Sequence, residues 1–145
     1  MTVFRDYERE LLRELVRIKV DFVLVGGAAV VMHGFDRNRP DIDILVSPER
    51  VNIEKLADFD LQWLHFKEKH LAALIEQGWL DLDQMKVQFL TRIKGVSTKD
   101  CFEKKTTLTD CGLEVPVISK ELLMVSKNAV GEPKDIENVK GLLKI

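Results

Sequence analysis

Two aspartates, Asp41 and Asp43, carry the most specific chemical signal in the sequence. Residues two apart on a strand point to the same face, so their carboxylates are expected to project together. Adjacent carboxylates repel each other unless a cation lies between them, and Mg²⁺ favours carboxylate oxygens combined with substrate phosphates. Asp41 and Asp43 are therefore candidate metal ligands and catalytic residues. A solvated acidic strand start is the alternative, but the apolar run at 44–46 that follows belongs to a core strand.

A pair of glycines, Gly26 and Gly27, precedes the aspartates by the length of a short helix. The pair follows the run 22–25, which is predicted to be a buried strand, and precedes the small apolar segment 28–33, which suits a helix. A helix N-terminus presents unpaired N–H groups, and glycine lets a phosphate approach the backbone closely. Gly26 and Gly27 are thus candidate nucleotide-binding residues, with a tight strand-to-helix turn as the alternative.

Two arginines, Arg37 and Arg39, lie in the polar loop at 35–40, directly before Asp41. A guanidinium group matches the geometry of phosphate oxygens, so both arginines are candidate triphosphate ligands. A pair of surface arginines without a ligand is the alternative interpretation.

The rest of the chain supplies the elements that must position these residues. Helices are predicted near 3–19, 48–57, 67–77, 120–130 and 133–143, with a shorter turn at 101–105; strands are predicted near 22–25, 41–46, 85–93, 106–109 and 114–118. Ser47 is expected to cap the second of these helices and Ser119 the fourth. The stretch LQWLHF at 61–66 fits a strand or a helix equally well. This mixture predicts one α/β (α+β) domain over residues 1–145.

Composition narrows the class of protein. The chain has 145 residues, of which 46% are hydrophobic and 32% charged, and a net charge of −2, so bulk charge does not predict binding to nucleic acid. Its apolar runs are far shorter than the roughly 20 residues that a membrane span needs. The N-terminal sequence has no apolar signal-peptide core. Cys101 and Cys111 lack metal-ligand spacing and are expected to be reduced thiols in the cytoplasm.

The block GGAAVVMHGFDRNRPDIDILV at 26–46 resembles the nucleotidyltransferase superfamily that includes DNA polymerase beta. It is most similar to a small prokaryotic branch, which contains minimal nucleotidyltransferase antitoxins and abortive-infection nucleotidyltransferases. VQFLTRIKGV at 87–96 resembles the third strand of the family, and the closing region at 115–143 is similar as well. The resemblance implies a nucleotidyltransferase-like mixed sheet flanked by helices. It also implies Mg²⁺- or Mn²⁺-dependent transfer of a nucleoside monophosphate from a nucleoside triphosphate to a hydroxyl of a protein or small molecule.

Gln88 departs from the pattern of the family, which usually has a third carboxylate at this position. A glutamine offers a neutral carbonyl oxygen but cannot accept the proton of an attacking hydroxyl. Asp81 and Asp83 are close in sequence and could compensate if the strand register brings one of them in. The alternatives are a catalytically weakened regulator that binds nucleotide or metal, and an antitoxin-like protein with a toxin partner.

Overall fold

A computed structural model of the chain describes residues 2–145 and contains one six-stranded mixed sheet, in the order β3-β4-β2-β1-β6-β5. The strands are β1 (Phe22–Val25), β2 (Ile42–Val46), β3 (Trp79–Leu82), β4 (Val87–Leu90), β5 (Thr106–Asp110) and β6 (Leu113–Val117). The α-helices are α1 (Asp6–Arg17), α2 (Gly26–Met32), α3 (Arg50–Glu54), α4 (Glu68–Gln77), α5 (Thr98–Glu103), α6 (Lys120–Val130) and α7 (Pro133–Leu143), and the 3-10 turns are η1 (Lys55–Asp58) and η2 (Asp83–Met85). The α/β prediction is thereby confirmed.

The centre of the sheet consists of β1, β2 and β4. β1 and β2 are antiparallel and place Val25 opposite Asp43, whereas β2 and β4 are parallel and place Asp43 beside Gln88. Every residue of β1 is buried, as are the apolar residues of β2. Burial on both faces explains why these strands are continuous apolar runs.

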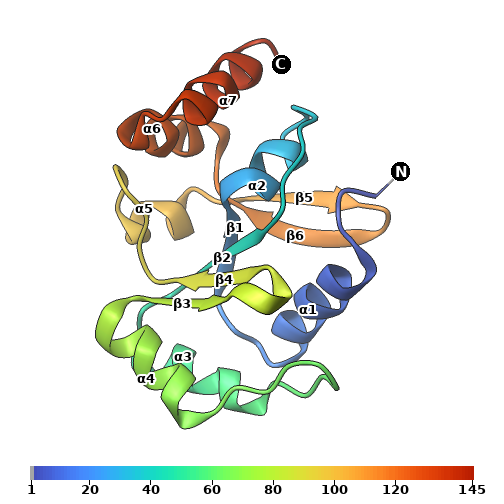
Figure 1. Cartoon of the computed structure of the whole chain (residues 1–145), viewed down its shortest axis with the longest axis vertical. Helices are drawn as coiled ribbons and strands as arrows, with labels where there is room; N and C mark the ends of the chain where they lie inside the picture. Colours follow the sequence, from blue (N-terminus) through green and yellow to red (C-terminus); the bar gives the residue numbers. More distant parts are fainter. Residues whose placement is uncertain (1) are drawn as a thin grey trace.

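The helices gather at two ends of the sheet (Figure 1). α6 and α7 pack together at the end where α2 lies, and α3 and α4 lie at the opposite end with α1 beside them. The strands β1 and β2 run between these two groups, and the loop after α2 passes beside α7 (Figure 1), where Phe35 lies against Gly141. In residues 2–145, no helix combines the length and the apolar character that a bilayer crossing requires.

The helices α6 and α7 begin and end where the sequence predicts. Ser119 Oγ accepts a hydrogen bond from the Leu122 backbone, and Gly131 ends α6 in the left-handed conformation. The helix predicted at 48–57 is present as α3 and η1, but its predicted start at Pro48 and cap at Ser47 were wrong, because α3 begins only at Arg50 with Glu49 at its N-cap. The chain stays extended there since Ser47 is held by backbone and side-chain bonds to Asp21 and Asn52.

Other boundaries differ from the prediction as well, including that of the turn expected at 101–105, which is α5 and begins at Thr98. The first helix is shorter than expected, because its first residues run extended and are bonded to Asp110. The LQWLHF stretch is neither helix nor strand but a turn closed by a bridge between Leu61 and Leu64. The predicted third strand at 85–93 contracts to β4, and β3, which pairs with it, was not predicted.

Candidate functional site

Gly26 lies directly beneath the carboxylate of Asp43. The backbone of Gly26 has a φ of +69°, a left-handed conformation that side chains rarely adopt. A Cβ built on Gly26 would collide with Oδ2 of Asp43 and would lie 3.0 Å from its Cγ. The β1–β2 register explains this proximity, since Asp43 pairs with the residue before Gly26. Glycine at this position is therefore what allows the first turn of α2 and the carboxylate to occupy adjacent space.

The guanidinium of Arg37 lies close to Gly27, the residue after Gly26. A Cβ on Gly27 would lie 3.2 Å from Nη1 of Arg37, so this guanidinium packs over the start of α2. The Nε of Arg37 donates to the Asn38 carbonyl at 3.1 Å, and Arg37 forms no ion pair with the residues between 2 and 145. The structure thus places Asp43 against Gly26, and Arg37 against the adjacent Gly27.

Replacing Gly26 with alanine is expected to destabilise the protein and to displace the Asp43 carboxylate. The left-handed backbone alone costs an L-residue about 1–3 kcal/mol, and the collision with Asp43 adds to this. Gly112 offers a matched control, because its φ is +81° and a Cβ there would meet nothing within 4 Å. Thermal unfolding should show a larger loss for Gly26→Ala than for Gly112→Ala. Equal losses would contradict a steric role for Gly26.

The carboxylates of Asp41 and Asp43 fit a divalent cation that also binds phosphate. Asp41 precedes β2 and is exposed, and Asp43 is half-buried within the strand. In the described part of the chain, no three His, Cys, Asp or Glu side chains converge to enclose a metal. Mg²⁺ is commonly held by only one or two carboxylates, with phosphates and water completing the octahedron. The donor set therefore suits a metal that arrives with a triphosphate better than a permanently enclosed one.

The electrostatic environment of Asp43 also fits a cation. Burial, followed by the charge of Asp41 and that of Asp81, raises the pKa of Asp43 to about 6. Lys127, whose ammonium lies 3.3 Å from Asp135, and Arg39 lower this pKa but do not offset the burial. A cation between the carboxylates would favour their ionised forms.

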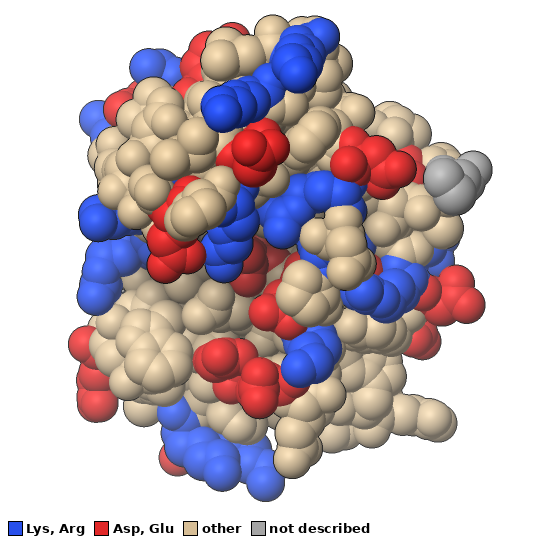
Figure 2. All heavy atoms as spheres, turned by 45° about the horizontal axis from the view of Figure 1, so that its top comes forward, with Lys and Arg blue, Asp and Glu red and all other residues tan. Residues whose placement is uncertain are grey.

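A cleft of about 310 Å³ opens at Gly26 and Asp43. Besides Gly26, its lining includes the polar residues Asp43, Arg92, Lys94, Ser126, Lys127 and Asp135. Figure 2 shows acidic and basic side chains gathered around a recess on the face of the molecule that the picture presents. The basic pair Arg92 and Lys94 was missed by the sequence reasoning, although both lie directly after the strand that carries Gln88. Their positive charge makes the cleft suitable for a polyphosphate despite the negative net charge of the chain.

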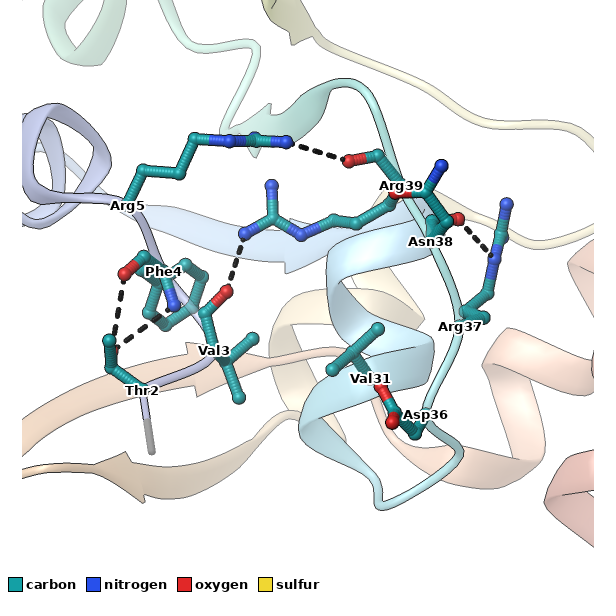
Figure 3. A pocket seen from close by; sticks show the side chains of 9 residues that line it. All are labelled: Thr2, Val3, Phe4, Arg5, Val31, Asp36, Arg37, Asn38 and Arg39. Atoms are coloured by element: carbon teal, nitrogen blue, oxygen red, sulfur yellow. Dashed lines mark hydrogen bonds between the residues drawn. The ribbon is translucent and has the colours of Figure 1, made fainter.

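The Cβ of Arg39 would lie 3.3 Å from a Cβ built on Gly27, but its guanidinium is bound to Glu8, which counts against the prediction that it binds a triphosphate. Its side chain is 7% exposed, and its guanidinium donates to both carboxylate oxygens of Glu8, at 2.6 and 2.8 Å. It also donates to the Val3 carbonyl at 2.9 Å (Figure 3). A further, longer bond of 3.4 Å goes to the Asp41 carbonyl. Because these protein oxygens occupy its donors, we assign Arg39 to the support of the loop that carries Asp41. Nothing near Arg39 in the sequence points to Glu8.

His33 and Gln88 also occupy defined positions in the fold. Nε2 of His33 is 2.7 Å from the Ile118 carbonyl, so His33 ties the end of α2 to the segment after β6. Gln88 lies in the sheet between Asp43 of β2 and Asp81 of β3. The register therefore brings Asp81 into line with the site, whereas Asp83 lies in the turn η2.

Several solved structures share this fold. The lincosamide antibiotic adenylyltransferase LnuA, solved with lincomycin bound, matches with a TM-score of 0.63 and 17% identity over 100% of this chain and 99% of that chain. A Thermotoga maritima protein assigned as a nucleotidyltransferase matches with a TM-score of 0.57 and 20% identity, over 96% of this chain and 93% of that chain. An antigenic nucleotidyltransferase-like protein from Paracoccidioides brasiliensis matches with a TM-score of 0.54 and 18% identity, over 94% of this chain and 73% of that chain. At such low sequence identity, these structural matches establish only that the fold is shared.

The family assignment rests on the sequence itself. No curated protein gives a significant match to the chain. The profile of the family described as nucleotidyltransferase of unknown function (DUF6036) matches residues 2–143. This match covers nearly the whole chain and agrees with the predicted superfamily, with the nucleotidyltransferase-like sheet, and with the arrangement of Gly26, Gly27 and Asp43. The chain therefore belongs to the DUF6036 nucleotidyltransferase family.

Proposed function

We propose that this protein transfers a nucleoside monophosphate from a nucleoside triphosphate to an acceptor hydroxyl, with Mg²⁺ or Mn²⁺ as cofactor. The observation that carries the proposal is the contact of the Asp43 carboxylate with Gly26, beside the guanidinium of Arg37 over Gly27. It joins a carboxylate that can hold a cation to a backbone that a phosphate can approach. The membership of the chain in a nucleotidyltransferase family supports the same reaction class.

The proposed roles follow from this geometry. Asp41 and Asp43 would hold the metal, and the backbone at Gly26 and Gly27 would lie against the triphosphate. Arg37 would steady the phosphate oxygens, because its Nη atoms are not engaged in an ion pair within residues 2–145. When bound, the metal would neutralise charge that develops on the transferred phosphate. The acceptor hydroxyl loses its proton as its oxygen bonds to the α-phosphorus. The bond from that phosphorus to pyrophosphate breaks, and pyrophosphate leaves with the electron pair.

The acceptor is proposed to be a hydroxyl of a small molecule or a protein. LnuA, whose fold the chain shares from end to end, is an adenylyltransferase of lincosamide antibiotics. A small-molecule hydroxyl and ATP are therefore the first acceptor and donor to test. Water and glycerol serve as simple acceptors that require no specific recognition.

Incubation of the protein with Mn²⁺ or Mg²⁺ and each of the four α-labelled nucleoside triphosphates tests this function. We expect tight binding by calorimetry, release of pyrophosphate and appearance of labelled product, all of which should disappear when the metal is chelated. Absence of both binding and turnover would refute the proposal.

Gln88 favours one alternative function. Its side chain cannot take a proton from an acceptor, and it occupies the position next to Asp43. A protein of this kind could bind a triphosphate and a metal as a regulator without transferring the nucleotide. In the same assay, binding of a labelled triphosphate with no pyrophosphate release from any acceptor would favour the regulator.

A further inference from the structure

Three polar side chains form one row across the sheet, at the edge of the site. Asp43 on β2 is in register with Gln88 on β4, and Gln88 is in register with Asp81 on β3. Residues in register on neighbouring strands point to the same face of a sheet. Asp81 therefore projects from the same face as Asp43, with the neutral glutamine between them.

The spacing of this row separates the two carboxylates. Neighbouring strands lie about 4.8 Å apart, which places the Cα atoms of Asp43 and Asp81 about 10 Å from each other. At this separation the two residues do not converge on one ion, in agreement with the lack of a three-ligand cluster in residues 2–145. They flank a gap above Gln88 instead. Asp81 is exposed, so its carboxylate is open to a molecule that enters this gap.

A second cavity leads to the gap from the side of β3. It has a volume of about 370 Å³ and is lined by Gly78, Trp79, Gln88, Leu90 and Arg92. Leu90 and Arg92 also line the cleft above Gly26 and Asp43, so the two cavities adjoin along β4. Trp79 is 46% exposed and lies on the same face of β3 as Asp81. Asp81 does not itself line this cavity, but it is in register with Gln88 and two residues from Trp79 on β3, so it lies next to the wall that these two residues form. An acceptor held at this wall would lie between Asp81 and a triphosphate at Gly26.

We infer that Asp81 replaces the carboxylate missing at Gln88 and accepts the proton of the acceptor hydroxyl. This inference rests on the proposed function. As the acceptor oxygen bonds to the α-phosphorus, its O–H bond breaks and the proton passes to a carboxylate oxygen of Asp81. The bond from the α-phosphorus to pyrophosphate breaks at the same time, with its electron pair leaving on pyrophosphate. The proposed general base thus lies on β3, one strand away from the position of Gln88 on β4, but in the same row of residues.

Moving the carboxylate back to β4 tests this inference. We compare the wild type with Asp81→Asn, Gln88→Asp and the double variant Asp81→Asn/Gln88→Asp, using each nucleoside triphosphate, Mn²⁺ and glycerol or water as acceptor. Asp81→Asn should lower the rate of pyrophosphate release by about 10²–10⁴-fold, the usual contribution of a general base. The double variant should recover at least about tenfold of this loss. A purely structural role of Asp81 would not be rescued by a carboxylate on another strand.

Calorimetric titration with the triphosphate and Mn²⁺ separates this inference from the proposed function. Asp81→Asn should bind the triphosphate as the wild type does, because its defect lies in proton removal. Asp83→Asn is the matched control, since Asp83 is exposed and its carboxylate has no hydrogen bond or ion pair with residues 2–145. It should leave both binding and rate unchanged.

Two outcomes would overturn the role of Asp81. The first is an Asp81→Asn variant that releases pyrophosphate as fast as the wild type. The second is a wild type that binds triphosphate without turnover while Gln88→Asp alone releases pyrophosphate, which would show that the third carboxylate is truly missing. A wild type that binds no triphosphate at all would refute the proposed function itself.

Discussion

Replacing Asp43 with asparagine is expected to abolish nucleotidyl transfer and to stabilise the free protein at neutral pH. The loss of activity follows from the proposed role of Asp43 as a metal ligand. Electrostatic stabilisation by a bound metal is worth several kcal/mol, which corresponds to about a thousandfold or more in rate. Pyrophosphate release with Mn²⁺ measures this loss.

The gain in stability follows from the pKa of Asp43, which rises from 3.8 to about 6 on folding. The folded chain thus binds this proton more tightly than the unfolded chain, so Asp43 lowers stability as the pH rises from about 4 through 6. Above this window the ionised carboxylate costs the fold about 3 kcal/mol at most, and about 1–2 kcal/mol after solvent screening. Asparagine removes this cost.

Thermal unfolding at two pH values checks the gain. At pH 7.5, Asp43→Asn should melt a few degrees above the wild type, since about 1 kcal/mol shifts the midpoint by about 2–4 °C in a chain of this size. The difference should shrink at pH 4.5. Adding Mn²⁺ should stabilise the wild type more than the variant. An Asp43→Asn protein that is less stable than the wild type at pH 7.5 would contradict the electrostatic picture.

Removal of the Glu8 carboxylate is expected to produce the largest loss of stability. Glu8 is fully buried in α1, where it receives two bonds from Arg39 and one from the Arg5 side chain. Loss of one partner of a buried ion pair costs about 3–5 kcal/mol, because the other charge stays buried and unpaired. Glu8→Ala should therefore lower the free energy of unfolding by this amount in urea denaturation. The exposed pair of Arg50 and Glu54 is the control, and Glu54→Ala should cost about 1 kcal/mol or less.

A double replacement separates the stability of the pair from its role in the site. Glu8→Leu with Arg39→Met removes both charges and should recover most of the lost stability. It also removes the bond from Arg39 to the Asp41 carbonyl, so the affinity for Mn²⁺ and triphosphate should remain below that of the wild type. If the double variant binds both as tightly as the wild type, Arg39 has no part in positioning Asp41.

Local patterns were sufficient to predict the elements of the site. Gly26, Gly27 and the strand with Asp43 are close in sequence, and their contact depends on one antiparallel pairing. The helix α6 was predictable because Ser119 and Gly131 supply its caps within the sequence itself. In such cases each residue carries its own structural preference, and no distant partner is needed.

The features that were missed depend on distant partners. Strand β3 exposes Trp79 and Asp81 and buries only Leu80, so its hydrophobic signal is weak, and pairing with β4 is what defines it. The role of Arg39 depends on Glu8, a residue of another element with no pattern that links the two. The helix α3 starts late because Asn52 bonds back to Ser47 and Asp21.

The sheet order has a consequence for how the site assembles during folding. The pairing of β1 with β2 closes a short stretch of chain, whereas the pairing of β1 with β6 joins Leu24 to Val117. Closing a longer loop costs more entropy, and distant pairings slow folding. The contact of Gly26 with Asp43 can therefore form early in folding. The side of the cleft that α6 forms, with Lys127, is expected to form later, with the distant pairing of β1 and β6. We expect hydrogen exchange during refolding to protect β1 and β2 before α6.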